Sequence, residues 1–485
     1  MAEIILFNPL CDPKRISFTI PPWALLYVSS GLVEDKYDVA IIDQNTEVTW
    51  KKRLREKLQA DTILVGVTAM TGLQINYALK FIREVKRLSK APIVWGGAHA
   101  SFFSRQTVMH PLVDYVIVGE GEQTIRELAF ALKNKTDVSG IRGLVHKRNG
   151  KVLVNKEREF TNLDDNKRVP YELIDVEKYI YKTDYARRNF EICTSRGCPH
   201  RCGFCYNVCY NKGKWRTMNV EKILENLKEM VEKYQLDGIN WREDNFFVDK
   251  KRVEAICRAI IDSGLKVKWH CDSRIDYFDK YDDPFIELLV SAGCARITFG
   301  IESGSPKVLR KIQKDIEVDQ VIRVNQKMKR HGIKCMYHFS FGYIGETMDD
   351  VIMTVRLADR LIRENPNAGI WPPSIYTPYP GTPLFDEAVK NGFKVPEKLE
   401  DFETLVWAKA NIPWLTKEEA KKIRAVSYIM SGYASKIPIA NQWFSYRWDN
   451  LIQRSAPGII PEKAVTDKIM SGIRSSRLIL RSVFA

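Results

Sequence analysis

The sequence predicts an α/β protein in three parts: an N-terminal Rossmann-like (flavodoxin-like) domain, a central partial (β/α)6 barrel of the TIM type, and a C-terminal helical extension. Two observations predict this fold class. Short apolar runs alternate with amphipathic helical patterns over residues 1–140, and the same alternation resumes at Asn189 and ends near residue 395. Strands joined in this way form parallel sheets, whose ligands bind at the carboxyl ends of the strands.

In the first part, residues 1–140, five apolar runs are expected to form a parallel sheet. The clearest helix is Ile75–Leu88, where apolar residues recur at helical spacing. The expected strands are Ile4–Phe7, Val39–Ile42, Ile63–Val67, Ile93–Trp95 and Tyr115–Val118. Residues 141–188 break this pattern. Within them Gly143–Asn155 is typical of a hairpin, and we expect the segment to link two domains.

Six strand and helix pairs follow within residues 189–395, as expected for an incomplete barrel with active residues at its strand ends. The expected strands are Phe190–Thr194, Gly238–Trp241, Val267–Cys271, Arg296–Gly300, Lys334–Phe341 and Gly369–Tyr376. The expected helices include Val220–Tyr234, Lys251–Ser263, Pro284–Ala292, Val318–Arg330 and Met348–Glu364. Residues 396–485 are expected to form the helical extension, which is rich in aromatic residues: Tyr428, Tyr433, Trp443, Phe444, Tyr446 and Trp448.

The composition indicates a large folded protein. Hydrophobic residues make up 45% and aromatic residues 11% of the 485 positions, which argues against disorder. The net charge of +15 is dispersed along the chain, so we expect no nucleic-acid partner. The N-terminus MAEIILFNPL is not a secretory signal, and no run reaches the ~18 apolar residues of a membrane span. We therefore expect a cytoplasmic protein with reduced cysteines.

The strongest motif is Cys198-Pro-His-Arg-Cys202-Gly-Phe-Cys205, which follows the first strand of the expected barrel. A 4Fe–4S cluster normally takes four cysteines, so three thiolates leave one iron open to bind a substrate. Gly197 and Gly203 allow the tight turns that one loop needs to wrap a cluster. The motif therefore predicts a metal site made by a single loop.

A structural zinc loop is the alternative, since Cys209 or His200 could complete a tetrahedral site.

The motif, with the aromatic Phe204 before its last cysteine, resembles that of the radical S-adenosylmethionine (SAM) superfamily. The resemblance implies that its three cysteines hold a 4Fe–4S cluster whose open iron chelates SAM, and that reduction cleaves SAM to a 5′-deoxyadenosyl radical. It also implies that Phe204 lies by the adenine and that an electron donor of the flavodoxin or ferredoxin type acts as partner.

Polar residues at the ends of the later barrel strands extend the resemblance. It implies that Asp244 holds the SAM amino group, in place of the family's Gly-Gly-Glu triplet, which is absent. Arg274 would fork onto the SAM carboxylate, as a guanidinium does. The candidate SAM-binding residues are Phe204, Asp244, Ser273, Arg274, Glu302 and Ser303. The alternative for each is a loop cap or an ion pair at the barrel rim.

Glycine-rich segments follow three strands of the first domain, and Pro92–Ser101 (PIVWGGAHAS) and Asp114–Glu122 (DYVIVGEGE) carry a second resemblance. They resemble the cobalamin-binding domain that a large class fuses to a radical SAM domain, an architecture matched over about residues 1–395. The resemblance implies that cobalamin is bound by Thr68, Ala69, Met70, Thr71, Gly72, Gly96, Gly97, Ala98, His99, Gly119, Glu120, Gly121 and Glu122.

The sequence departs from classical cobalamin domains in the motif that binds cobalt. Their Asp-x-His-x-x-Gly motif, which supplies the lower cobalt ligand, is missing from the loop Asn8–Lys14. We therefore expect cobalamin without a histidine ligand, and His99 as a pocket residue. The alternative is a domain that has lost cobalamin and only supports the barrel or binds substrate.

These resemblances imply a C-methyltransferase. The adenosyl radical would abstract hydrogen from an unactivated carbon of a small-molecule or lipid-like substrate, and methylcobalamin would supply the methyl group. A non-methylating cyclase or oxidative enzyme of tetrapyrrole or lipid metabolism is one alternative, and a non-catalytic iron–sulfur or cobalamin redox or sensing module is another. The aromatic tail would suit a hydrophobic substrate and peripheral membrane contact. The sequence indicates no oligomeric state.

Overall fold

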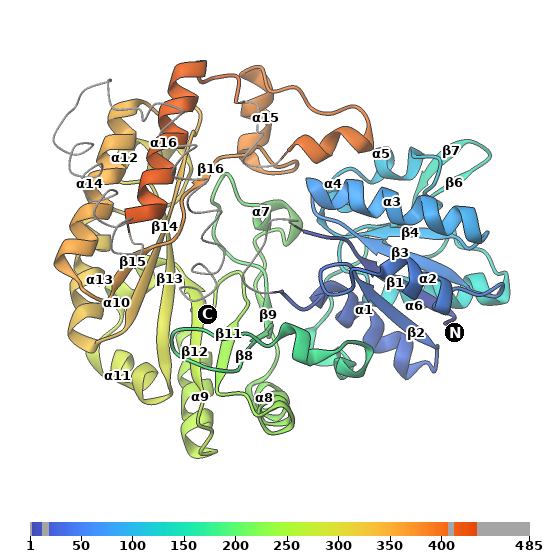
Figure 1. The fold of residues 1–485 in the computed structure, drawn as a ribbon, viewed down its shortest axis with the longest axis horizontal. Helices are drawn as coiled ribbons and strands as arrows, with labels where there is room; N and C mark the ends of the chain where they lie inside the picture. Colours follow the sequence, from blue (N-terminus) through green and yellow to red (C-terminus); the bar gives the residue numbers. More distant parts are fainter. Residues whose placement is uncertain (1, 12–18, 406–411, 434–485) are drawn as a thin grey trace. The chain divides into compact units, whose positions relative to one another are not determined.

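The computed structural model describes residues 2–11, 19–405 and 412–433, and the chain divides into two compact α/β units (Figure 1). Unit 1 comprises Met1–Ile180 with the later segments Tyr379–Gly381 and Lys394–Ala410. Unit 2 comprises Tyr181–Pro378, Thr382–Phe393 and Asn411–Ala485. The predicted α/β fold class is confirmed. The aromatic residues expected at 443–448 lie outside the described residues.

Unit 1 contains a seven-stranded sheet of order β2-β1-β3-β4-β5-β6-β7, whose first five strands are parallel. All residues of β1 and β2 are buried, because helices cover both faces of the sheet. The strands are β1 (Ile4–Asn8), β2 (Val39–Asp43), β3 (Leu64–Thr68), β4 (Ile93–Gly96) and β5 (Tyr115–Ile117). The helices are α1 (Trp23–Glu34), α2 (Trp50–Lys57), α3 (Leu73–Leu88), α4 (Ala98–Phe102), α5 (Ser104–Met109) and α6 (Glu122–Asn134).

The expected hairpin belongs to this sheet. Strands β6 (Leu144–Arg148) and β7 (Lys151–Val154) continue it antiparallel beyond β5. The turn between them uses Asn149 and Gly150, whose φ angles of 50° and 74° match a tight hairpin turn. This part of the expected linker is therefore an integral edge of unit 1. Short 3₁₀ turns follow at Leu163–Asp165, Tyr171–Leu173 and Val176–Tyr179.

Unit 2 is a half-barrel of six parallel strands that pair in chain order. The strands are β8 (Asn189–Ile192), β11 (Gly238–Trp241), β12 (Lys268–Ser273), β13 (Cys294–Glu302), β14 (Lys334–Phe341) and β15 (Ala368–Ile370). The helices are α8 (Val220–Tyr234), α9 (Lys250–Asp262), α10 (Ile275–Lys280), α11 (Asp283–Ser291), α12 (Pro306–Lys311), α13 (Val318–His331), α14 (Met348–Glu364) and α15 (Pro383–Lys390).

Smaller elements complete unit 2. Strands β9 (Ser195–Arg196) and β10 (Arg216–Thr217) form a separate antiparallel pair around α7 (Asn207–Tyr210). The last expected strand is divided into β15 and β16 (Ser374–Ile375), because Pro372 and Pro373 lack the N–H that a strand ladder needs. Helix α16 (Lys417–Tyr433) packs against α14.

The segment after residue 394 first returns to unit 1. The 3₁₀ helix Leu399–Thr404 packs against α3, and the ring of Phe402 lies 4.6 Å from that of His99. The expected helical extension from residue 396 onward therefore begins as a part of the unit 1 core. Within the described ranges, no helix combines the length and the apolar character needed to cross a membrane.

Candidate functional site

The three motif cysteines lie on one loop that runs from β9 to α7 in unit 2. Backbone hydrogen bonds hold the middle of this loop on both sides: Gly203 N donates to Ile312 O at 2.8 Å, and Leu384 N donates to Gly203 O at 2.8 Å. A Cβ at Gly203 would lie 3.0 Å from Leu384 Cγ, so the close approach favours glycine there. The middle of the loop is thus held by backbone hydrogen bonds on both sides.

Gly197 starts the cysteine loop with a φ of 88°, a left-handed conformation that favours glycine. A Cβ there would lie 2.0 Å from Lys214 O, which leaves no room for a side chain. Its N–H donates to Oδ2 of Asp244 at 2.8 Å. The expectation that this glycine allows a tight turn agrees with the structure.

Cys202 is buried, and Cys198 and Cys205 are partly buried. Burial raises the pKa of Cys198 and raises the pKa of Cys205 to about 11, and the neighbouring Cys202 raises both further. Among the described residues, no three His, Cys, Asp or Glu side chains are grouped to hold one metal ion. A 4Fe–4S cluster needs no such group, because each thiolate binds a different iron. Bound iron would supply the positive charge that these thiolates need.

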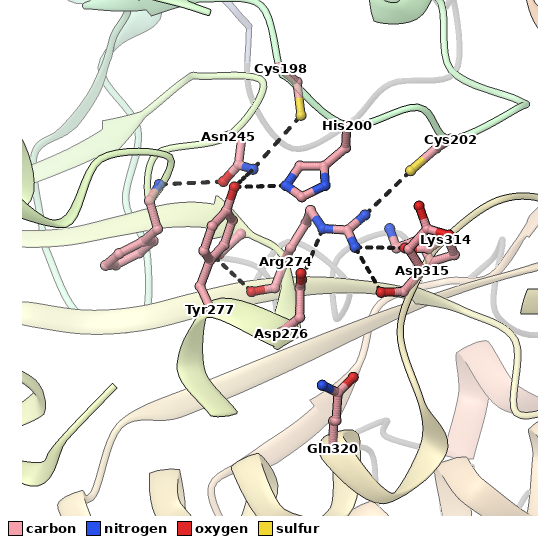
Figure 2. Close-up of polar contacts among 12 residues, drawn as sticks. Cys198, His200, Cys202, Asn245, Arg274, Asp276, Tyr277, Lys314, Asp315 and Gln320 are labelled. Atoms are coloured by element: carbon pink, nitrogen blue, oxygen red, sulfur yellow. Dashed lines mark hydrogen bonds and ion pairs between the residues drawn. The ribbon is translucent and has the colours of Figure 1, made fainter. Parts of the chain in front are cut away.

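Cys209 and His200, the fourth ligands that a zinc site would require, have other surroundings. Burial and the nearby Asp386 raise the pKa of Cys209. His200 directs its Nε2 to the hydroxyl of Tyr277 at 2.7 Å (Figure 2). Burial lowers the pKa of His200 to about 4 and raises that of Tyr277 to about 12, so both are neutral near pH 7. This arrangement favours three cysteine ligands over the zinc alternative.

Two side chains donate to the cysteine sulfurs, as Figure 2 shows. Asn245 Nδ2 points at Cys198 Sγ over 3.8 Å, and Arg274 Nη1 lies 3.5 Å from Cys202 Sγ. Asn245 is buried and also contacts the Tyr277 hydroxyl at 3.4 Å. Sequence reasoning missed Asn245, although its place in the Arg242–Asn245 segment after β11 was a signal for it.

The resemblance implied that Arg274 would offer two free guanidinium nitrogens to a SAM carboxylate, but the structure bonds these nitrogens to the protein. Its Nε donates to Asp276 Oδ1 at 2.9 Å and its Nη2 to Lys314 O at 2.6 Å, while Nη1 reaches Cys202. Each guanidinium nitrogen therefore already has a protein partner, and the side chain is only 7% exposed. This geometry favours a role at the cysteines over the expected one.

The acidic pair after β11 is divided between two roles. Glu243 is buried, where it accepts from Thr194 N at 3.2 Å and pairs with Arg252 at 3.1 Å. Asp244 is exposed, and besides Gly197 N it accepts from the Tyr206 hydroxyl at 3.0 Å. Asp244 thus lies beside the cysteine loop with a surface open to a ligand, which fits the predicted contact with the SAM amino group.

The serine candidates for SAM binding are engaged with the protein. Ser303 is fully buried, where its Oγ lies 3.1 Å from Thr354 Oγ1 and accepts from Ser305 N at 3.1 Å. Ser273 is also buried and donates to the carbonyl of Arg274 at 3.0 Å. Both therefore cap local backbone, which is the alternative role considered for the strand ends, and Ser303 has no surface for the expected SAM contact.

Glu302 ends β13 with a φ of 70°, an uncommon conformation for a residue other than glycine. Its carboxylate is buried between Lys314 Nζ at 3.0 Å and His338 Nδ1 at 3.4 Å. Burial would raise its pKa, but Lys314 and His338 lower it to about 2. Glu302 is thus a charged acceptor at a strand end, and its SAM contact stays a prediction.

Phe204 is part of an apolar surface beside the cysteines. Its ring packs against the cluster formed by Val308, Ile312, Tyr343, Tyr376 and Leu384. The ring centroids of Phe204 and Tyr343 are 5.9 Å apart, and Lys314 Nζ lies 5.8 Å from the Phe204 ring. An apolar surface with one cation at its edge suits a flat base, in line with the expected adenine contact.

A row of polar residues on the half-barrel strands escaped sequence reasoning. On β12, Trp269 and Cys271 are buried, whereas His270 and Asp272 on the opposite face are only partly covered. His270 Nε2 lies 2.8 Å from Thr298 Oγ1 on β13 and 3.7 Å from Asp272. Arg242 follows β11, and the nearby Glu191 and Asp272 raise its pKa against the lowering effect of burial. The polar alternation in Lys268–Ser273 was the available signal.

In unit 1, the loops after β3, β4 and β5 lie side by side, as expected from the sheet. Ala69 N donates to Gly96 O at 3.2 Å, and His99 N donates to Ala69 O at 3.2 Å. Gly119 N donates to Ser101 Oγ at 2.9 Å, which joins the third loop to α4. These bonds bring together the segments Thr68–Gly72, Gly96–His99 and Gly119–Glu122, on which the expected cobalamin residues lie.

The glycines of these loops are of two kinds. Gly97, at φ 92°, leaves no room for a side chain, because a Cβ would lie 2.7 Å from Thr68 Oγ1. Gly96 and Gly119 instead face open space, with nothing within 4 Å of an added Cβ. An open edge without side chains lets a backbone approach a large flat ligand, so these two glycines fit cobalamin.

The remaining residues of the expected cobalamin site are placed as follows. His99 is buried, its Nδ1 lies 3.0 Å from Thr71 Oγ1, and burial lowers its pKa to about 4. Met70 is 61% exposed. Glu120 accepts from Thr161 N at 2.8 Å. Ala98 opens α4, Gly72 precedes α3, and Gly121 precedes Glu122 at the start of α6. The structure thus gathers the predicted segments but places His99 inside the core.

A cavity of about 520 Å³ in unit 1 lies at the end of β2. Asp43 forms part of its wall and accepts from the Tyr179 hydroxyl at 2.7 Å. Within the described part of the chain, the lining includes none of the residues expected to bind cobalamin. It comprises Ile41, Asp43, Thr46, Glu47, Arg53, Glu172, Leu173, Ile174, Asp175, Lys178 and Tyr179.

Two known families match separate parts of the chain. Residues 192–358 match the radical SAM superfamily, and residues 14–129 match the B12 binding domain. An uncharacterised methyltransferase of Pyrococcus horikoshii is 30% identical over 94% of this chain and 98% of its own length. The anaerobic magnesium-protoporphyrin IX monomethyl ester cyclase of Synechocystis is 25% identical over 65% of this chain and 63% of its own length.

Solved structures show the same fold. The radical SAM methyltransferase TsrM from Kitasatospora setae, with cobalamin and a [4Fe-4S] cluster bound, is 18% identical with a TM-score of 0.68, covering 98% of this chain and 100% of that one. The cobalamin-dependent SAM radical enzyme OxsB, with aqua-cobalamin and SAM bound, is 18% identical with a TM-score of 0.71 over 93% of this chain and 71% of that one.

Proposed function

The chain belongs to the cobalamin-dependent radical SAM family, and on that premise we propose that it is a C-methyltransferase acting on a polar small molecule. Its cofactors are a 4Fe–4S cluster, SAM and cobalamin. The observation that carries the proposal is the full-length relative named as a methyltransferase. The names of shorter matches, a tryptophan 2-C-methyltransferase and a bacteriochlorophyllide d C-8(2)-methyltransferase among them, support carbon as the acceptor.

When bound, these cofactors supply a 5′-deoxyadenosyl radical and a methyl group. The protein's share is to fix the cofactors and the substrate carbon in line, which lowers the entropic barrier. Cys198, Cys202 and Cys205 would hold the cluster on a loop that is already fixed by the backbone of Gly203. Asp244 would hold the SAM amino group beside that loop. A flavodoxin or ferredoxin would supply the electron.

The half-barrel interior supports a polar substrate over a lipid-like one. Arg242 and Asp272 have side-chain exposures of 49% and 44% on the face that carries His270. Charged groups that stay partly hydrated can exchange water for a substrate's charged groups, whereas an apolar chain would remove that water and offer no polar contact in its place. We therefore assign Arg242 and Asp272 to substrate binding.

Cobalamin would bind on the open edge formed by Gly96 and Gly119, without a histidine on cobalt. Two facts support the absence of a histidine ligand to cobalt. The loop Asn8–Lys14 contains no histidine, and the ring of Phe402 covers His99. Electron paramagnetic resonance of the cob(II)alamin form tests this proposal. Superhyperfine splitting from a protein nitrogen would contradict it.

The experiment that tests methyl transfer is isotope tracing. The anaerobically reconstituted enzyme, given SAM labelled in its methyl group and a small-molecule extract of its source cells, is expected to place label on carbon in a product. A Cys205→Ala variant serves as control and should form neither product nor 5′-deoxyadenosine. The cyclase relative supports a second candidate function, a non-methylating reaction. Formation of 5′-deoxyadenosine and a new product without label would favour that candidate.

The alternative function, a non-catalytic redox or sensing module, leads to a different expected result. It would bind a cluster and cobalamin without cleaving SAM. The same assay decides this, because reduced protein of that kind would form no 5′-deoxyadenosine with any extract.

A further inference from the structure

A buried cation is held against one of the three cluster thiols. Arg274 Nη1 lies 3.5 Å from Cys202 Sγ, and the guanidinium is almost closed to solvent. In such surroundings, a charge is weakly screened and acts strongly on its neighbours. The second side-chain donor at the site is the neutral amide of Asn245, which is farther from its sulfur, at 3.8 Å from Cys198. The thiols are therefore electrostatically unequal.

The position of this cation is fixed by a turn that follows α12. Its carbonyls at Lys314 and Asp315 accept from Arg274 Nη2 at 2.6 and 3.4 Å. Gln313 and Asp315 both have a φ of 53°, which is uncommon outside glycine and aims these carbonyls at the guanidinium. The Asp276 carboxylate forms an ion pair with Nε from the other side, at 2.9 Å, and offsets part of the charge that reaches Cys202. Arg274 therefore has little freedom to leave Cys202.

The same turn also supports the cysteine loop. Ile312 O accepts from Gly203 N at 2.8 Å, and the Asp315 carboxylate pairs with Arg201 at 3.0 Å. The backbone of this turn thus holds both the cysteine loop and the guanidinium of Arg274. A shift of Arg274 relative to Cys202 would require the turn to move, and the turn is bonded to the loop itself.

We propose that Arg274 is a positioning residue that acts on the cluster through Cys202, by raising the cluster's reduction potential. One-electron reduction adds a negative charge to the cluster, and a fixed cation with a hydrogen bond to a cluster sulfur favours the reduced form. The role expected from resemblance was a contact with the SAM carboxylate. The present one rests on the cluster alone and not on methyl transfer.

A redox titration of the reconstituted full chain tests this inference. The signal of the reduced cluster is followed by electron paramagnetic resonance against dithionite, without SAM or substrate. Arg274→Met is expected to make reduction about tenfold less favourable, a shift of about 59 mV to more negative potential. Arg274→Lys keeps the charge but cannot serve the two carbonyls and the sulfur together, so it should shift less.

The matched control is Arg310→Met, which removes an exposed cation near the end of α12, just before the same turn, without touching a sulfur. Its potential should equal that of the unchanged protein. A residue that only binds the SAM carboxylate would leave the potential of Arg274→Met unchanged in this SAM-free titration, and that result overturns the inference. An equal shift in Arg310→Met overturns it as well.

Loss of the cluster from Arg274→Met would move the decision to Arg274→Gln, which keeps an N–H donor at this position but removes the charge. A more negative potential in that variant supports the inference, and a potential equal to that of the unchanged protein overturns it. A chain that binds no cluster even when unsubstituted would instead contradict the family's cofactor set. A failure of methyl transfer leaves the titration unaffected, so the two failures can be told apart.

Discussion

Arg252 and Glu243 form an ion pair closed to solvent: Nη2 lies 3.1 Å from Oε1, and the side chains are 4% and 0% exposed. The Glu243 carboxylate also accepts from the N–H of Thr194 at 3.2 Å and from the Ser195 hydroxyl at 2.5 Å. The pair therefore anchors the chain where it enters the cysteine loop.

Removal of one partner of this pair should be strongly destabilising. Arg252→Met leaves a buried carboxylate without its cation, which typically costs about 3–5 kcal/mol of the free energy of unfolding. Urea unfolding followed by circular dichroism measures the loss. The control is Arg360→Met, which breaks an exposed pair with Glu364 and should cost less than about 1 kcal/mol. Equal losses in the two variants would contradict the structural role of the pair.

His99 should make the stability of the apo protein depend on pH. Burial lowers its pKa to about 4 from an ordinary value near 6.5, so between these values the unfolded chain binds more protons than the folded one. Stability contributed by neutral His99 is complete above about pH 6.5 and falls as the pH falls toward 4, by about 3 kcal/mol. In His99→Gln the free energy of unfolding should decline less steeply over this range. Parallel curves for the two proteins would refute the prediction.

The fold could be predicted because its signals are local. Apolar runs and helical spacing depend on a few consecutive residues, and helices α8 and α14 begin and end as predicted. The hairpin Leu144–Val154 was recognised from its turn residues. Its pairing with β5 was missed, because the partner of a strand is chosen by the whole sheet and leaves no local mark.

For the site, the sequence predicted the cysteine ligands but not the partners of the side chains around them. The cysteine spacing is a signal within one loop. The partners of Arg274 are backbone carbonyls of residues 314 and 315, and no sequence pattern shows where a carbonyl points. Ser303 was chosen as a polar residue at a strand end, but its burial against Thr354 depends on the packing of α14. Polar type indicates what a residue can bind, and packing decides which partner it meets.

Substitution of single cysteines should separate the cluster ligands from Cys209. Cys198→Ala, Cys202→Ala and Cys205→Ala each remove one of three thiolates and should lose most of the bound iron. Cys209→Ala should retain about four irons per chain, as a 4Fe–4S cluster requires. Iron analysis with the visible absorption spectrum measures both. Loss of the cluster from Cys209→Ala alone would mean a fourth cysteine ligand and no open iron for SAM.

Substitutions in the half-barrel interior should uncouple SAM cleavage from product formation. Arg242→Gln and Asp272→Asn remove charges that we assign to the substrate, and a lost charged hydrogen bond costs about 1.5–3 kcal/mol, or roughly ten- to hundredfold. Transfer of labelled methyl groups into extract-derived product should fall by that factor, while reduced enzyme without substrate forms 5′-deoxyadenosine as before. The control is Lys268→Gln, at the exposed opposite end of β12, where no effect is expected. An equal fall in both activities would place these two residues at SAM instead of the substrate.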